Sequence, residues 1–167
     1  MNVLLSVKPQ YAEAIVYGRK KYEFRRSIFK RKDIDRVYIY STSPKNKIIA
    51  SFEIEKILTD SPQKIWDICR KHAGMSKSDF FTYFEGSPIA FAIKINNVCG
   101  FANPIDPHYI INKFRPPQSF YYIPINLFQE QGGDKNSERN CELVLLSDSG
   151  SGVSSIKNHY ENDVRME

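Results

Sequence analysis

The sequence predicts an α+β fold, a small and mostly antiparallel β-barrel with helices at its rim. The 167 residues are enough for one domain, since independent domains usually have about 100–150 residues. Strand-like and helix-like segments follow one another in the order β-α-β-β-β-α-α-β-loop-β. That order lacks the regular alternation of strand and helix in a doubly wound parallel sheet, so a small barrel fits better.

The first part of the chain predicts two strands around a short helix. Asn2–Val7 is mainly apolar and predicts a strand. Pro9–Tyr17 predicts a helix, because proline suits the first helical turn and Gly18 can adopt the left-handed conformation that ends it. Lys20–Arg26 alternates between aromatic and charged residues, which predicts a strand with one apolar face and one charged face.

Two neighbouring strands follow, Arg36–Tyr40 and Lys47–Leu58, joined by a turn at Ser43–Asn46. Both are rich in β-branched and aromatic residues. Tyr38 and Tyr40 share one face of the first of these strands. If that face is exposed, the pair is a stacking platform for unpaired bases, and if both faces are buried the pair belongs to the core.

Two helices come next in the chain. Ser61-Pro62 begins a helix that runs to about His72. Ser76, with Asp79 three residues later, predicts the cap of a second helix, which Gly86 closes. Each helix carries apolar residues on one side, which we expect in the core: Ile65, Trp66 and Cys69 on the first, and Phe80, Phe81 and Phe84 on the second.

The predicted fold ends with two strands. Ile89–Val98 predicts a strand, and Gln118–Ile123, bounded by prolines, predicts the last one. Between them, Cys99–Arg115 predicts a long irregular segment.

The charge distribution predicts a folded domain over residues 1–131 and a flexible acidic tail over 132–167. The tail carries 4 Lys and Arg against 7 Asp and Glu, a net charge of −3, whereas residues 1–131 carry 20 against 12, a net charge of +8. Gly- and Ser-rich composition such as that of Ser147–Ser155 buries too little to offset its ordering entropy. The apolar run Cys141–Leu146 either adds a strand to the domain or stays in the tail.

Composition and motifs exclude several classes of protein. The sequence contains no apolar run of roughly 18 residues, and the apolar stretch at its start is too short for a secretory signal. We therefore expect a soluble, cytoplasmic protein without membrane contact. Three widely spaced cysteines form neither a disulfide framework nor a paired zinc motif. Cys69 and His72 lack a second pair of ligands, and the phosphate-loop, dinucleotide and zinc-protease motifs are absent. We therefore expect no metal and no cofactor.

A short signature suggests a family. Gly18–Arg25 (GRKKYEFR) matches G-x-K-x-x-E-x-R directly after the first predicted helix. With the opening LLSVKPQYAEAI, the segment VYIYSTSP and the late Pro116–Phe120 (PPQSF), the chain resembles the ASCH domain of the PUA-like superfamily over roughly residues 3–125. The resemblance implies a β-barrel related to the RNA-binding PUA domain, with a cleft lined by the signature residues. Its members are proposed to bind RNA in translation or transcription regulation, a distant bacterial branch hydrolyses N4-acetylcytidine, and some resemble ribonucleases.

The resemblance and the charges together define a candidate nucleic-acid site. Glu23 and Arg25 lie two residues apart on one strand face. Either the carboxylate holds the guanidinium toward a phosphate or a base edge, or the two form an exposed salt bridge that contributes little. Between Arg19 and Arg36, nine Lys and Arg oppose three acidic residues, a charge that attracts polyanions. The predicted binding residues are Lys20, Lys21, Glu23, Arg25, Arg26, Tyr40, Gln118 and Ser119.

Lys20 and Glu23 are also the candidate catalytic residues if the protein is an enzyme. A lysine whose pKa is lowered by burial or by neighbouring cations can act as a base, whereas a solvated lysine supplies only charge. In the acetylcytidine hydrolases a proposed threonine nucleophile aligns with Glu23, so this chain lacks that hydroxyl.

The leading hypothesis is an RNA-binding regulatory module that holds a nucleotide or single-stranded RNA in a basic cleft. The alternative is a small metal-independent hydrolase of a modified nucleoside or of RNA, with Lys20 as base and Glu23 as its partner. A module that binds an acidic protein is a third possibility.

Overall fold

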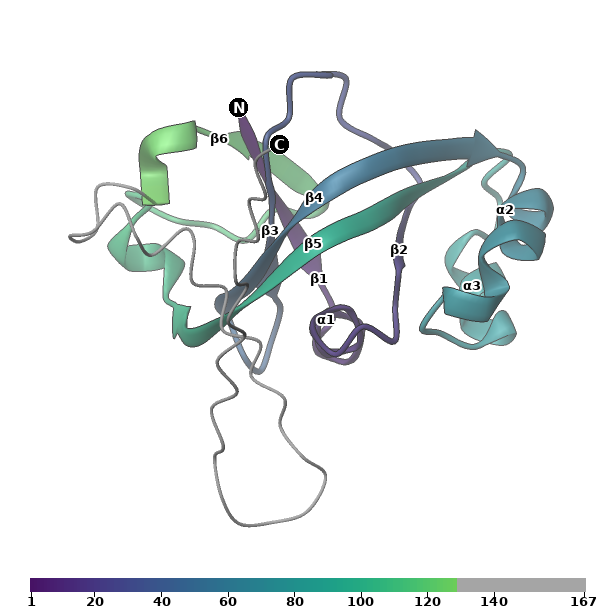
Figure 1. The fold of residues 1–167 in the computed structure, drawn as a ribbon, viewed down its shortest axis with the longest axis horizontal. Helices are drawn as coiled ribbons and strands as arrows, with labels where there is room; N and C mark the ends of the chain where they lie inside the picture. The colour runs from purple at the N-terminus through teal and green to yellow at the C-terminus, as the bar shows by residue number, and fades with distance from the viewer. Residues whose placement is uncertain (129–167) are drawn as a thin grey trace, which may run out of the picture.

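The computed structural model describes residues 1–128 and contains one six-stranded sheet in the order β2-β5-β4-β3-β1-β6. The sheet curls into a half-barrel, with α2 and α3 beyond one end and β6 at the other (Figure 1). Strand β1 is parallel to β3, and every other pair of neighbours is antiparallel. The elements are β1 (Asn2–Val7), α1 (Pro9–Val16), β2 (Tyr22–Arg25), β3 (Val37–Ser41), β4 (Lys47–Asp60), α2 (Pro62–Cys69), η1 (Arg70–His72), α3 (Lys77–Tyr83), β5 (Ala90–Ile105), η2 (Pro107–Tyr109), β6 (Phe120–Ile123) and η3 (Ile125–Phe128).

The predicted fold class and order of elements are confirmed. The N-cap of α3 is confirmed as well, since the Ser76 hydroxyl accepts a 3.0 Å hydrogen bond from the Asp79 amide. The predicted tail over 132–167, the possible strand at Cys141–Leu146 and the end of the domain at residue 131 lie outside the described residues and stay predictions. No helix within residues 1–128 is long and apolar enough to cross a membrane.

The prediction of an irregular segment over Cys99–Arg115 was wrong for its first part, residues 99–105, whereas residues 106–115 are irregular apart from η2. Strand β5 continues to Ile105, whereas an irregular segment was expected from Cys99 onward. Strand β5 is longer than expected because its partner β4 is nearly as long. The two strands stay paired from Asp60↔Ala90 to Ile48↔Ile105, with three shifts of register. Such bulges absorb residues that do not fit a regular strand pattern, so the ladder continues through a sequence that looks irregular by itself.

The core consists of three clusters of buried side chains. The α1 cluster lies between α1 and the sheet and includes Leu5, Ile15 and Ile39. The α2–α3 cluster packs the aromatic residues of both helices against β2 and β5, as expected for Trp66 and Phe80. The β6 cluster covers the other face of β1 and β3, so these central strands are buried on both faces.

The prediction of an exposed platform formed by Tyr38 and Tyr40 was wrong, and the alternative, that the pair belongs to the core, is confirmed. Tyr38 and Tyr40 are 8% and 2% exposed and belong to the β6 cluster. The Tyr38 ring stacks on Phe128 at a centroid distance of 3.8 Å, and the Tyr40 ring meets Phe114 edge-on at 5.2 Å. Segments that follow β5 in the chain therefore cover the face that the sequence left open.

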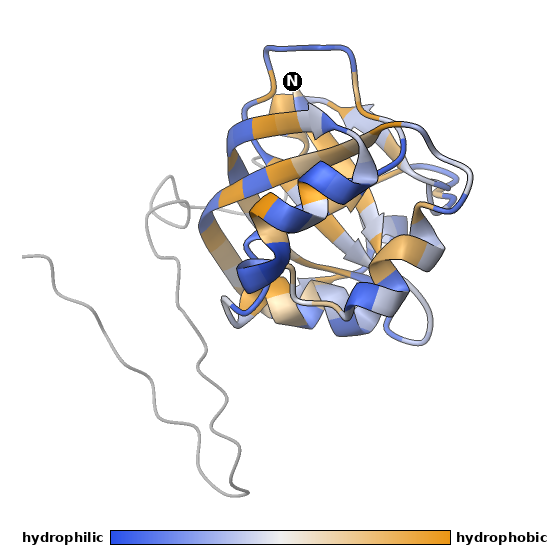
Figure 2. Ribbon diagram, turned by 90° about the vertical axis from the view of Figure 1, so that its right-hand side faces the viewer, coloured by the Kyte–Doolittle hydropathy of each residue, from blue (hydrophilic) through white to orange (hydrophobic). Residues whose placement is uncertain are grey.

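Much of the basic charge lies on the loop between β2 and β3. This loop is hydrophilic and projects from the body of the domain (Figure 2). Lys30, Arg31 and Lys32 are all exposed. Arg31 forms a 2.6 Å ion pair with Asp33 on the same loop, which neutralises part of the loop's charge.

Candidate functional site

The signature residues of β2 lie at one edge of the sheet. Strand β2 pairs with β5 alone among the described strands. Phe24 packs into the α2–α3 cluster, whereas Glu23 and Arg25 face the interior of the half-barrel and are 5% and 8% exposed. Both faces of this short strand are therefore covered, and the interpretation of Glu23 and Arg25 as an exposed salt bridge was wrong.

Lys20 is held in the interior from the link between α1 and β2. Gly18, with a φ of 73°, ends α1, and the Lys20 amide donates to the Ala14 carbonyl at 2.9 Å. The side chain is 2% exposed. Its Nζ donates to the Ala73 carbonyl at 3.1 Å, lies 3.7 Å from Glu23 Oε2 and lies 4.3 Å from the centre of the Phe24 ring.

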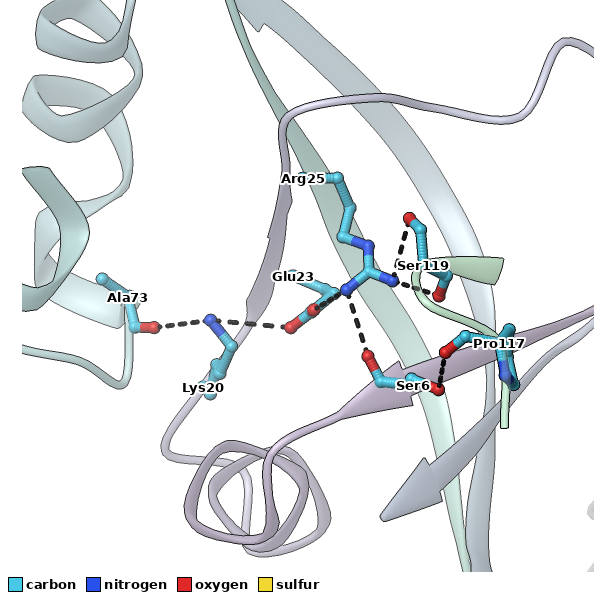
Figure 3. A network of polar contacts seen from close by, with 7 residues as sticks. All are labelled: Ser6, Lys20, Glu23, Arg25, Ala73, Pro117 and Ser119. Carbon is cyan, nitrogen blue, oxygen red and sulfur yellow. Dashed lines mark hydrogen bonds and ion pairs between the residues drawn. The ribbon is translucent and has the colours of Figure 1, made fainter. Parts of the chain in front are cut away.

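Arg25 joins the two edges of the sheet. Its Nη1 donates to the Ser6 carbonyl at 3.1 Å and to Glu23 Oε1 at 3.4 Å, and its Nη2 donates to the carbonyl and the hydroxyl of Ser119 (Figure 3). Ser6 lies on β1 and Ser119 directly precedes β6, the edge strand opposite β2. One guanidinium thus spans the opening of the half-barrel.

These three charged residues form one network, the Lys20–Glu23–Arg25 network. Glu23 contacts both cations, one through each carboxylate oxygen. With all three residues ionised the network carries two positive charges and one negative charge, so it has one uncompensated positive charge in a buried place. Because unpaired buried charge is costly, the network favours an anion at its border. Arg25 Nε is also buried without a hydrogen-bond partner in the described part of the chain.

The environment of Lys20 lowers the pKa of its side chain. Burial lowers the pKa of the Lys20 ammonium below the ordinary value for lysine, and attraction to Glu23 acts in the opposite direction. A lowered pKa makes the ammonium a stronger acid near neutral pH. It also increases the fraction of neutral amine, which can act as a base. Lysine in such surroundings is a candidate for acid/base chemistry as well as for charge.

The remaining predicted site residues are not gathered around this network to the same degree. Ser119 is half-buried and bound by Arg25, whereas Lys21, Arg26 and Gln118 are exposed. Arg26 lies 5.3 Å from the centre of the Tyr83 ring on α3. Tyr40 is not part of the network, since its ring lies in the β6 cluster and its hydroxyl donates to Asn46 at 3.2 Å.

Several contributors to the network were missed by sequence reasoning. Ser6 is a half-buried hydroxyl residue within an otherwise apolar run of β1, and this pattern was a usable signal. Its hydroxyl donates to the Pro117 carbonyl at 2.6 Å, which fixes the approach to β6. Tyr11, whose ring centre is 5.5 Å from Lys20 Nζ, and the Ala73 carbonyl carried no such signal, because their roles depend on the packing of distant segments.

Gly74 is required by the position of Lys20. A Cβ at this glycine would lie less than 3.0 Å from the Cα, Cβ and Cγ atoms of Lys20, and its φ of 62° is left-handed. We expect Gly74→Ala to displace Lys20 and to lower the melting temperature more than Gly86→Ala does. Gly86 shares the left-handed backbone, with a φ of 73°, but has no atom within 4 Å of the Cβ position. The control thus isolates the backbone cost of about 1–2 kcal/mol, and equal losses in the two variants would contradict close packing at Lys20.

No group of three or more His, Cys, Asp or Glu side chains within residues 1–128 is arranged to hold a metal ion. The Cys69 thiol is buried in the α2–α3 cluster, and burial raises its pKa to about 11, so it stays protonated at neutral pH.

Comparison with known proteins places the chain in a family. The model of the ASCH domain matches residues 5–98. A Zymomonas mobilis protein named ASCH domain-containing ribonuclease is 31% identical over 128 residues, which cover 73% of this chain and 84% of that protein. The crystal structure of ASCH from Zymomonas mobilis superposes with a TM-score of 0.72 at 30% identity, over 77% of this chain and 91% of that one. Large ribosomal subunit protein uL22 of Ureaplasma parvum is 25% identical over 122 residues, 73% of this chain but 39% of that protein. The resemblance inferred from the signature is thereby confirmed, and this chain belongs to the ASCH domain family.

Proposed function

We propose that this chain binds single-stranded RNA and cleaves it, with the Lys20–Glu23 pair as the acid/base group. The observation that carries the proposal is the buried Lys20–Glu23–Arg25 network, in which a lysine of lowered pKa is paired with a carboxylate and sits beside an arginine. The relative named a ribonuclease shares most of the folded part of this chain, which supports RNA as the substrate.

A phosphodiester is the ligand that the charges suit. The network has one excess positive charge, and Arg25 Nε, which has no hydrogen-bond partner within residues 1–128, is the guanidinium donor left for a phosphate oxygen. Tyr11, Ser6 and Ser119 are half-buried and border the network, so a phosphate would approach it from their side. A bound phosphate would also offset the buried positive charge, which gives its binding an electrostatic reason.

The proposed reaction uses the 2′-hydroxyl of RNA itself. Glu23 accepts the proton of the 2′-hydroxyl while its oxygen forms a bond to the adjacent phosphorus. The bond from phosphorus to the 5′-oxygen of the next nucleotide breaks, and the Lys20 ammonium donates a proton to that oxygen. The products are a 2′,3′-cyclic phosphate and a free 5′-hydroxyl, and Arg25 stabilises the charge that develops on the phosphoryl oxygens.

Incubation with a defined single-stranded RNA, followed by mass spectrometry, tests this function. We expect fragments that end in a 2′,3′-cyclic phosphate and begin with a 5′-hydroxyl. A matched RNA with 2′-O-methyl groups should stay intact, because its nucleophile is blocked. RNA that is retained at low salt but never cleaved would reject the catalytic proposal and leave the RNA-binding regulatory module. Release of acetate from N4-acetylcytidine would instead identify a nucleoside amidohydrolase.

A further inference from the structure

Two basic segments that are far apart in the sequence lie side by side in the fold. They are Arg19–Lys21, before β2, and η1, which is Arg70–His72. The Lys21 amide donates to the His72 carbonyl at 2.9 Å, and Lys20 Nζ donates to the Ala73 carbonyl at 3.1 Å. Figure 3 shows the second of these contacts, with Lys20 and Ala73 pointing toward each other. The close approach of Gly74 to Lys20 holds the two segments together.

We refer to the exposed basic side chains of these two neighbouring segments as the basic patch. It comprises Arg19, Lys21, Arg70, Lys71 and His72, all of which are exposed. Within residues 1–128 none of the five forms an ion pair, although other basic residues do. For example, Lys94 Nζ lies 2.6 Å from Glu55 Oε1, and Lys47 Nζ lies 2.8 Å from Asp106 Oδ2. The charge of the patch is therefore available to a ligand.

We infer that this basic patch binds the sugar–phosphate backbone of the single-stranded RNA that reaches the Lys20–Glu23–Arg25 network. The inference rests on the proposed function and assigns the part of the surface that holds the substrate. Lys20 itself is buried and paired, so it releases few counterions when RNA binds. The exposed cations on either side of it do release them, and counterion release is the main source of affinity for a polyanion.

RNA suits this patch better than an acidic protein surface. All five members of the patch are basic side chains exposed to solvent. Protein interfaces concentrate aromatic and apolar residues at their centre and are depleted in lysine. Contacts with phosphate groups use lysine and arginine, as this patch does.

The test measures the affinity for a 2′-O-methyl single-stranded RNA as a function of salt, because that RNA binds without being cleaved. We expect Lys21→Gln/Lys71→Gln to reduce the slope of log affinity against log salt by about 1.4, or about 0.7 for each lost contact. The control Lys45→Gln/Lys113→Gln removes the same charge from exposed positions elsewhere and should keep the wild-type slope. Lys45 lies in the turn between β3 and β4, and Lys113 lies beside the β6 cluster.

The outcomes separate this inference from the proposed function. A wild-type slope in Lys21→Gln/Lys71→Gln, with RNA cleavage by the wild-type protein intact, would overturn the patch and leave the ribonuclease proposal standing. Oligoglutamate that competes as well as RNA of equal charge would overturn the choice of RNA as the ligand. Absence of RNA binding by the wild-type protein would overturn both proposals together.

Discussion

Replacing Lys20 by methionine is expected to lower the rate of RNA cleavage by at least about 100-fold, since a positioned acid or base contributes about 10²–10⁴-fold. Methionine is unbranched and pairs well with aromatic rings, so it can occupy the space beside Phe24. Glu23 keeps Arg25 as its partner in this variant, so no carboxylate is left buried alone. The measurement is the single-turnover cleavage rate on a labelled RNA, together with the affinity for its 2′-O-methyl form.

Two further readouts make the assignment of Lys20 specific. Lys56→Met removes an exposed lysine of β4 and should leave the cleavage rate unchanged. In the wild-type protein the rate should fall as pH rises through the pKa of Lys20, because the ammonium then loses the proton that it donates. That pKa is lowered by burial, so the fall should begin below the pH expected for a solvated lysine. An unchanged rate in a folded Lys20→Met protein would remove Lys20 from the mechanism.

Replacing Arg25 by alanine is expected to lower the stability of the domain by about 3–5 kcal/mol, the usual cost of removing one partner from a buried ion pair. For a domain of this size the melting temperature should fall by roughly 10 °C or more. The guanidinium donates to Glu23, to the Ser6 carbonyl and to Ser119. Alanine leaves these acceptors without their donor and opens the contact between the two edges of the sheet.

Hydrogen exchange can separate this effect from a general loss of stability. Amides of β1 and β6 should exchange faster in Arg25→Ala by a larger factor than amides in the centre of β4 and β5, because Arg25 holds the β6 edge. The neighbouring Arg26→Ala is the matched control, since that side chain is exposed and contacts the Tyr83 ring. Its melting temperature should stay near that of the wild type. Equal effects of the two substitutions would show that Arg25 does not close the half-barrel.

Lys20 and Arg25 have different structural roles, so a loss of activity has a different meaning in variants of each residue. The polar contacts of Lys20 are with Glu23 and one backbone carbonyl, and methionine can keep its packing beside Phe24, so the loss of the ammonium should mainly change chemistry. Arg25 contacts three segments, so its loss should change the fold before it changes chemistry. A loss of activity in Arg25→Ala therefore identifies a catalytic role only if the variant is folded under the conditions of the assay.

Local chemistry along the chain determined the order of elements and the family. Proline at the first turn of α1 and α2, the Ser76 cap of α3 and the left-handed Gly18 each act within a few residues, so the sequence alone predicts them. The signature at Gly18–Arg25 likewise combines neighbouring residues, and it pointed to the correct family.

The tertiary structure alone decided which faces are covered and which residues meet. Alternation along β2 tells which side chains share a face, but the curl of the sheet buries the charged face of this edge strand. The same curl brings Ser119 and Ser6 to Arg25, and the packing of η1 brings the Ala73 carbonyl to Lys20. These contacts join residues between 19 and 94 positions apart. The physical reason is that burial is a property of the assembled sheet and its coverings, whereas the sequence pattern records only periodicity within each strand.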